Sequence, residues 1–232
     1  MSELLNRLQQ RLDYQFAEPE LLQQALTHRS YSGHNNERLE FLGDGLLNFV
    51  IGDALYARKP RDEEGALSRL RASLVREETL AKLARELELG EFLKLGESEL
   101  KSGGFRRDSI LADAFEAILG AIFLDGGFEK ARAAALRLYT ALLDTLPDPE
   151  RLKDAKTRLQ EWLQARARPL PLYTVLSEDG PPHARRFHVR CALTDAELGS
   201  EARGGSRRIA EQRAAEMLLK QLEQIGSGPD HA

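Results

Sequence analysis

Apolar and polar residues follow helical spacing through most of the first two thirds of the chain. Stretches such as residues 77–89 and 131–143 are rich in Ala, Leu, Glu and Arg, which are strong helix formers. Glycines and prolines separate these stretches. Residues 1–147 are therefore predicted to form an all-α domain. Pro147 and Pro149 interrupt helical spacing, so residues 148–153 are predicted to be a linker.

The pattern changes after this linker. Residues 154–166 again have helical spacing, whereas residues 172–177, 187–193 and 197–203 have strand character, clearest in the alternation of Phe187, Val189, Cys191 and Leu193 with polar neighbours. Residues 206–224 are predicted to form a long amphipathic helix. The order α-β-β-β-α predicts a small α+β domain over residues 154–225, followed by a disordered tail at 226–232.

Carboxylates share one face of two predicted helices. In residues 36–50, Glu37, Glu40 and Asp44 fall within an arc of about 60°, opposite the apolar side chains. The same spacing assigns Phe49 to the apolar face. In residues 109–122, Asp113 and Glu116 lie together in the same way. Such like charges lower helix stability unless a cation faces them, and Mg²⁺ prefers carboxylate oxygens. The spacing leaves two interpretations, a metal site and a solvated acidic face.

Two further features of the first domain are ambiguous by themselves. Phe41 falls beside the acidic face and off the apolar one, so it is either a surface residue or an anchor for another chain. Glu63 and Glu64 precede the next predicted helix, where the helix dipole alone would favour acids.

Composition and charge narrow the class of protein. The chain has 232 residues, of which 42% are hydrophobic, so wholesale disorder is excluded. No apolar run approaches the ~20 residues that cross a bilayer, no secretory signal opens the chain, and the single Cys191 excludes an internal disulfide. These features predict a soluble, cytoplasmic protein. Residues 1–150 carry 26 acidic and 19 basic side chains, whereas residues 151–225 carry 10 and 14, an asymmetry that points towards a polyanion partner.

The acidic helices also carry a resemblance to a known family. The string Asn36–Asp44, NERLEFLGD, resembles the signature of the ribonuclease III family, and Asp108–Ala117, DSILADAFEA, resembles its second acidic segment. The basic C-terminal part resembles a double-stranded-RNA-binding domain. The resemblance covers about residues 3–223, and the two-domain plan is similar to the bacterial form. One departure is Gly45, where the family often has Ser; we expect no effect on the chemistry.

The resemblance implies an endoribonuclease that hydrolyses both strands of double-stranded RNA with Mg²⁺, for which Mn²⁺ can substitute. It implies 5′-phosphate and 3′-hydroxyl ends with a short 3′ overhang, and the processing of ribosomal RNA precursors and other structured transcripts. It also implies a homodimer with Phe41 inserted into the partner, no membrane and no small-molecule cofactor. The acids that it assigns are Glu40, Asp44, Asp113 and Glu116 as metal ligands, with Asp44 and Glu116 catalytic, and Glu37 and Glu64 as secondary acids near the cleavage site.

Cations in both domains are candidates for RNA contact. Ser206, Arg207 and Arg208 open the last predicted helix, whose N-terminus attracts phosphate, so we favour phosphate contact for the two arginines over the alternative of ordinary surface residues. The resemblance adds Thr157, Gln160 and Glu161 on the first helix and His183 in a Gly-Pro loop as contacts in successive minor grooves. Glu211 stands where many such domains have lysine and is predicted to remove one phosphate contact. In the nuclease part, Lys101, Arg106 and Arg107 flank a Gly-Gly turn and are predicted to contact phosphate, against the alternative of a solvated basic loop.

Two other classes of function remain open from the residues. One is a non-catalytic protein that sequesters RNA duplexes, for which the loss of an acid would be the sign; none is lost here. The other is a metal-dependent phosphohydrolase for a small substrate with an unrelated basic domain. Removing residues 151–232 separates this last alternative, because only cleavage of duplex RNA depends on the basic domain.

Overall fold

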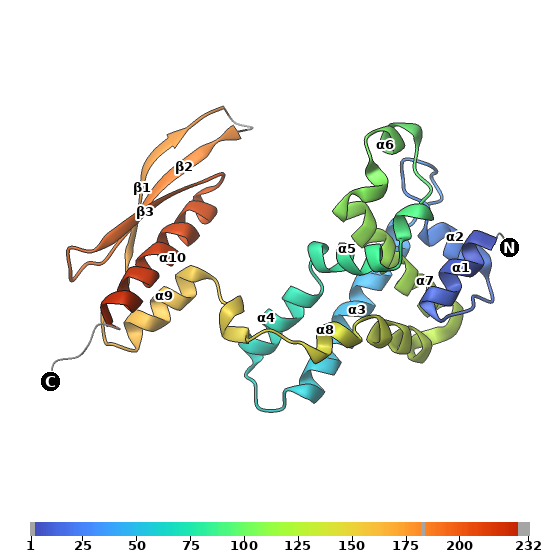
Figure 1. Cartoon of the computed structure of the whole chain (residues 1–232), viewed down its shortest axis with the longest axis horizontal. Helices are drawn as coiled ribbons and strands as arrows, with labels where there is room; N and C mark the ends of the chain where they lie inside the picture. Colours follow the sequence, from blue (N-terminus) through green and yellow to red (C-terminus); the bar gives the residue numbers. More distant parts are fainter. Residues whose placement is uncertain (1–2, 182–183, 227–232) are drawn as a thin grey trace. The chain divides into compact units, whose positions relative to one another are not determined.

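The chain divides into two compact units, Met1–Leu152 and Lys153–Ala232, which are described separately (Figure 1). The computed structural model describes residues 3–181 and 184–226. The predicted fold class, an all-α domain followed by an α-β-β-β-α domain, is confirmed. No helix in the described part of the chain is long and apolar enough to cross a membrane.

The first unit is helical almost throughout. Its elements are α1 (Glu3–Leu12), α2 (Pro19–Ala25), α3 (Glu37–Arg58), α4 (Glu64–Leu74), α5 (Glu77–Glu86), η1 (Leu89–Glu91), α6 (Glu97–Lys101), η2 (Gly104–Arg106), α7 (Asp108–Leu138), α8 (Thr140–Asp144) and η3 (Pro149–Leu152). The long helix α7 packs along α3 and also contacts α2 and α5. Because it is covered on several sides, α7 is buried well beyond one face, and small residues such as Ala114, Ala117 and Ala121 keep it narrow.

Two local features shape the C-terminal part of this unit. The helix α7 is kinked at Gly127, whose φ of 80° is accessible to glycine without strain. Within the segment predicted as a linker, η3 contacts α4 through Arg69, which donates a hydrogen bond to the Pro149 carbonyl at 3.3 Å and lies 3.7 Å from Glu150. The C-terminal end of the first unit is thereby held against α4.

The second unit is a three-stranded antiparallel sheet with two helices. Its elements are α9 (Ala155–Gln164), β1 (Leu172–Asp179), β2 (Arg186–Ala192), β3 (Gly199–Gly204) and α10 (Arg207–Gly226), with strand order β1-β2-β3. The helix α10 packs on β2 and β3, and α9 packs on α10. The core between them is apolar: Leu159, Leu163, Cys191, Leu193, Ala214, Ala215, Leu218, Leu219 and Leu222. Of the predicted tail, Gly226 ends α10, and the remaining residues lie outside the described part of the chain.

Polar caps define where the two helices of this unit begin. The Asp154 carboxylate accepts a hydrogen bond from the Thr157 amide at 2.9 Å, which fixes the start of α9. The Ser206 hydroxyl accepts from the Ile209 amide at 3.2 Å in the same manner, so α10 begins at the residue after the predicted cap.

Candidate functional site

The acidic faces of α3 and α7 meet because glycines let the two helices approach. A Cβ built on Gly43 would lie 1.9 Å from the Glu116 carbonyl oxygen, and one built on Gly120 would lie 2.2 Å from the Leu39 carbonyl oxygen. No side chain fits at either position without displacing the opposite backbone. This close crossing brings the carboxylates of both helices to one place.

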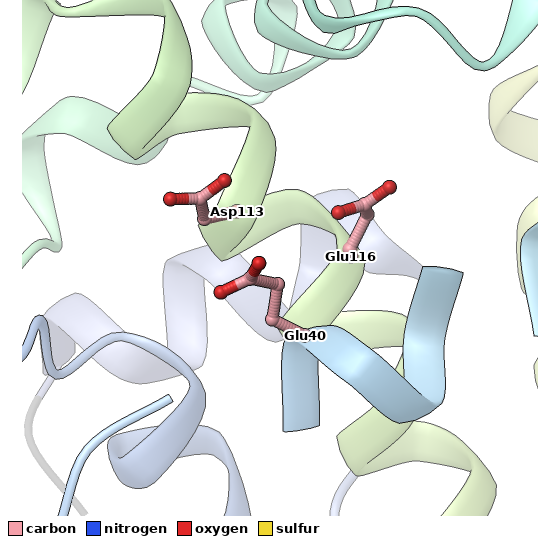
Figure 2. Close-up of side chains that lie close together, drawn as sticks. All are labelled: Glu40, Asp113 and Glu116. Carbon is pink, nitrogen blue, oxygen red and sulfur yellow. The ribbon is translucent and has the colours of Figure 1, made fainter. Parts of the chain in front are cut away.

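Three of the predicted metal ligands form a compact cluster. Glu40 of α3 and Asp113 and Glu116 of α7 each offer a carboxylate oxygen, and the three oxygens lie within 4.8 Å of one another. Figure 2 shows the three side chains converging from the two helices. Glu40 and Asp113 are half-buried, and Glu116 is only 9% exposed. A freely solvated acidic face, the alternative left open above, does not fit so buried a carboxylate.

Burial and mutual repulsion perturb all three acids. Burial, the largest cause, and the charges of Asp44, Glu40 and Asp113 together raise the pKa of Glu116 to about 8. The pKa of Glu40 is raised by burial and then chiefly by the charge of Asp113. Burial also raises the pKa of Asp113, although the nearby His28 opposes the shift. The cluster therefore lacks compensating positive charge in proportion to its carboxylates.

This donor set suits a hard divalent cation. Mg²⁺ and Mn²⁺ bind carboxylate oxygens, usually from a few side chains together with water. Three carboxylates within reach of one another, with pKa values raised for want of positive charge, match that preference.

The other three predicted acids are not among these three clustered residues and make separate contacts. Asp44 is near enough to raise the pKa of Glu116, and its carboxylate accepts a hydrogen bond from the Asn48 amide group at 2.7 Å. Glu37 pairs with Arg29 at 3.4 Å. Glu64 accepts from the Ser68 hydroxyl at 2.7 Å. The structure thus brings three of the six acids together and places Asp44 beside them.

The exposed side of α3 carries aromatic side chains. Phe41 is 80% exposed, as the sequence suggested, but Phe49 is 62% exposed, so its assignment to the apolar core face was wrong. Its ring lies edge-on against Phe128, with 5.8 Å between centroids. Phe49 and Tyr56 line a hollow of about 650 Å³ that also contains Glu64. A helix with three exposed aromatic residues presents a surface suited to another protein chain.

One of the three predicted loop cations faces the acidic cluster. Arg107 lines a hollow of about 440 Å³ together with Glu40 and Asp113, and it pairs with Glu99 at 3.1 Å. Lys101 instead pairs with Glu97 at 3.5 Å, and the Arg106 guanidinium lies 5.1 Å from the centroid of the Phe105 ring. Neither Lys101 nor Arg106 is part of the lining described for this hollow.

The predicted RNA contacts of the second unit lie at the starts of its helices and on α9. Thr157 donates its hydroxyl hydrogen to Asp154 at 3.1 Å, and Glu161 pairs with Lys153 at 2.7 Å. Gln160, Arg207 and Arg208 are exposed. His183 lies outside the described residues.

A cationic hollow in this unit escaped the sequence analysis. Four arginines from three places in the chain, Arg185, Arg186, Arg203 and Arg213, line a hollow of about 610 Å³ together with Ala184, Gly204 and Gly205. None of the described residues that line it is acidic. The Arg213 guanidinium donates to the Arg203 carbonyl at 2.9 Å, and Arg185 pairs with Glu178 at 2.7 Å. Strand alternation indicated that Arg186 faces outward, but the pairing of β2 with β3 that brings Arg203 close is not readable from a single sequence.

Comparisons with known proteins match both units of the chain to known families. The ribonuclease-III-like family model matches residues 18–142, and the double-stranded RNA binding motif matches residues 155–222. A protein named Ribonuclease 3 from Alkalilimnicola ehrlichii is 59% identical over 216 residues, which cover 93% of this chain and 95% of the relative. Ribonuclease 3 from Hahella chejuensis is 55% identical over 96% of this chain and 98% of its own. A solved structure of the nuclease domain of ribonuclease III from Campylobacter jejuni is 48% identical to this chain and superposes with a TM-score of 0.58. The match covers 59% of this chain and 96% of that chain, which is described with structural flexibility in a region involved in dimer formation.

Proposed function

This chain belongs to the ribonuclease III family of double-stranded-RNA endoribonucleases, and from that premise we propose that it cleaves with Mg²⁺ held by Glu40, Asp44, Asp113 and Glu116. Mn²⁺ can take the same place. Asp44 and Glu116 are the acids that we propose to be catalytic. The convergence of Glu40, Asp113 and Glu116 carries this proposal, because three partly buried carboxylates with raised pKa values need a cation.

The chain's own residues supply position and charge. When bound, the metal would lower the pKa of an attacking water and stabilise the leaving oxygen, so no side-chain nucleophile is required. Glu116, held on α7 against Gly43, has little freedom to move away from the cluster. Asn48 orients the Asp44 carboxylate from one turn further along α3. Glu37 and Glu64 are proposed as secondary acids near the cleavage site, and Arg107 as a contact to the phosphate next to it.

We propose that the protein works as a homodimer with Phe41 as an anchor. The exposed aromatic residues of α3 support an interface there, and the Campylobacter jejuni relative is described as having a region for dimer formation in this domain. The two strands of a duplex are related by two-fold symmetry, so a two-fold dimer offers one acidic cluster to each strand. The products that we propose, from the family resemblance, have 5′-phosphate and 3′-hydroxyl ends with a short 3′ overhang.

The second unit is proposed to hold the duplex by shape. Thr157, Gln160 and Glu161 on α9 would contact one minor groove, His183 the next, and Arg207 and Arg208 the phosphates of the major groove between them. Domain limits of 1–147 and 154–225 around a linker at 148–153 complete the proposal. Ribosomal RNA precursors and other structured transcripts in the cytoplasm are the proposed substrates. The alternative hypothesis of a small-substrate phosphohydrolase with an unrelated basic domain is wrong, because relatives match both units together.

The substitution Glu116→Gln tests the catalytic assignment. We expect E116Q to abolish cleavage of a long RNA duplex in Mg²⁺ while leaving duplex binding within about twofold of wild type. Glu129 lies on the same helix and is exposed, so E129Q is the matched control and should cut normally. Cleavage by E116Q at the wild-type rate contradicts the assignment, and a wild-type protein that binds duplexes in Mg²⁺ without cutting them contradicts the enzyme.

A further inference from the structure

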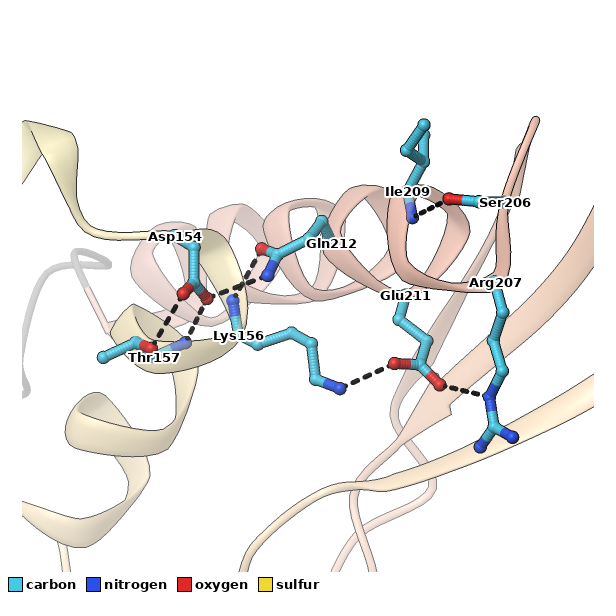
Figure 3. Close-up of polar contacts among 8 residues, drawn as sticks. All are labelled: Asp154, Lys156, Thr157, Ser206, Arg207, Ile209, Glu211 and Gln212. Atoms are coloured by element: carbon cyan, nitrogen blue, oxygen red, sulfur yellow. Dashed lines mark hydrogen bonds and ion pairs between the residues drawn. The ribbon is translucent and has the colours of Figure 1, made fainter. Parts of the chain in front are cut away.

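A buried carboxylate joins the starts of the two helices in the second unit. Glu211 of α10 is 8% exposed. One of its oxygens accepts a hydrogen bond from the Lys156 ammonium of α9 at 2.7 Å, and the other accepts from Nε of Arg207 at 2.8 Å (Figure 3). A single side chain therefore bridges a lysine in the first turn of α9 and the arginine that begins α10.

The positions of these cations explain why a carboxylate is needed between them. Lys156 is the second residue of α9 and Arg207 the first residue of α10, and the N-terminal end of a helix disfavours positive charge. Glu211 compensates both charges at once. Burial by itself would raise the pKa of Glu211, but the hydrogen bonds from Lys156 and Arg207 outweigh it and hold the pKa below its ordinary value. The carboxylate is thus charged over the whole neutral range.

Neighbouring contacts hold the same junction. The Lys156 ammonium lies 4.3 Å from the centroid of the Tyr173 ring, which limits where the lysine side chain can go. Gln212, the next residue of α10, accepts from the Lys156 amide at 3.2 Å and donates to Asp154 at 2.9 Å. Asp154 in turn caps α9 at Thr157. Figure 3 shows the hydrogen bonds of Asp154, Lys156 and Gln212 between the start of α9 and the first turns of α10.

The Arg207 guanidinium is fixed at one nitrogen and open at the others. Its side chain remains 64% exposed although Nε is bonded to Glu211. Among the described residues, Glu211 is the one hydrogen-bond acceptor of this guanidinium. The two terminal nitrogens, which can bind a phosphate in bidentate fashion, are therefore presented to solvent in a defined orientation.

We propose that Glu211 is a positioning residue for RNA binding, which aims Arg207 at phosphate and fixes the start of α9 relative to the start of α10. This rests on the proposed function of the second unit. It replaces the expectation from sequence that the acid merely removes one phosphate contact. This carboxylate joins two of the parts proposed to contact RNA, α9 and the start of α10, and balances the charge of both, while Gln212 and Asp154 hold the same junction.

The two explanations predict opposite effects of a lysine at this position. If Glu211 only removes a contact, E211K adds a cation, so affinity for duplex RNA rises and the slope of log affinity against log salt steepens by about one. If Glu211 positions its neighbours, E211K sets a third cation against Lys156 and Arg207. In that case E211K and the near-isosteric E211Q both bind at least about twofold more weakly, the lower end of coupling between contacting residues.

The experiment measures binding of the full chain to a 20-base-pair RNA duplex without divalent metal, for wild type, E211Q, E211K, R207A and E211Q/R207A. We expect R207A to weaken wild-type binding clearly and to have much less effect in the E211Q background. Loss of general stability would not produce this non-additivity. The matched control is E216Q, on the same helix with an exposed i,i+4 partner in Lys220, and it should bind as wild type does. Thermal melting of each variant shows that it is folded at the assay temperature.

Three results overturn the proposal: tighter binding by E211K, unchanged binding by E211Q, or equal effects of R207A in both backgrounds. A wild-type chain that fails to bind the duplex at all would instead overturn the proposed function.

Discussion

Gly43 of α3 faces the Glu116 carbonyl of α7 so closely that a Cβ on the glycine would lie 1.9 Å from that oxygen. Glu116 carries the most strongly shifted carboxylate of the acidic cluster. The close packing of the two helix backbones therefore also determines the position of a proposed catalytic acid.

Replacing Gly43 by alanine should separate the two helices. We expect G43A to lower the free energy of unfolding by about 1–3 kcal/mol, the usual cost of overpacking a tight contact, and to reduce cleavage at least tenfold by displacing Glu116. Gly45 lies one residue past Asp44 in open space and supplies the control. G45A should raise stability by up to about 1 kcal/mol and cleave normally, because alanine is the better helix former. Urea unfolding and a cleavage assay measure both; equal behaviour of the two variants contradicts the argument.

The raised pKa of Glu116 predicts how the metal-free protein responds to pH. The group titrates near 4.5 when unfolded and near 8 when folded, so between these values the folded state holds a proton that the unfolded state releases. Stability should therefore fall as pH rises from about 5 to about 8. In thermal melts with EDTA, E116Q should show a flatter pH dependence than wild type, and E129Q should follow wild type. A wild-type melting temperature that rises across this range contradicts the prediction.

A divalent ion should reverse this loss. Added Mg²⁺ favours the charged carboxylates, so it should raise the wild-type melting temperature more at pH 8 than at pH 5. The same melts in Mg²⁺, with E116Q as the variant that has lost a ligand, measure the effect. An equal Mg²⁺ response in E116Q would show that the ion binds elsewhere.

The exposed ring of Phe41 predicts the behaviour of the dimer. Large aromatic side chains at the centre of interfaces often contribute about 2 kcal/mol or more, so F41A should weaken self-association about thirtyfold or more. Sedimentation equilibrium measures the dissociation constant. Tyr31 is also exposed, at 59%, but lies in a turn outside α3, so Y31A should leave the constant unchanged. A monomeric wild-type protein, or an unchanged constant for F41A, counts against Phe41 as the anchor.

Much of the acidic site was predictable because it depends on local periodicity. The spacing of Glu40, Asp113 and Glu116 placed each on the correct side of its helix, and the family resemblance added their role. The close approach of Gly43 to Glu116 was not predictable, since it joins residues more than seventy positions apart and depends on how two helices cross.

The wrong assignment of Phe49 and the missed arginine hollow also have physical causes. The angular position of Phe49 on a helical wheel grouped it with the apolar residues of α3. A wheel does not show which part of α3 is covered by a neighbouring helix, and the Phe49 ring is exposed. In the second unit, the alternation along each strand showed which side chains share a face of the sheet. It did not show which residues of β2 and β3 pair. The pairing of His188 with Arg203, and of Phe187 with Gly204, places the ends of β2 and β3 side by side and gathers arginines that are distant in sequence.

That gathering of arginines gives a prediction about salt. Arg186 and Arg203 line the cationic hollow beside Gly204 and Gly205, which lead directly into the start of α10, so a phosphate chain that contacts α10 passes close to them. Each phosphate contact that is lost should reduce the slope of log affinity against log salt by about 0.9. For a 20-base-pair RNA duplex, R186Q/R203Q should therefore lower the slope by about 2 and weaken binding most at low salt.

Arg190 provides the control for this prediction. It is exposed on the same strand as Arg186 but pairs in register with Glu201, outside the hollow, so R190Q should change the slope little. An unchanged slope for the double variant would show that the duplex does not reach this hollow, and an equal change in R190Q would show only a general effect of charge.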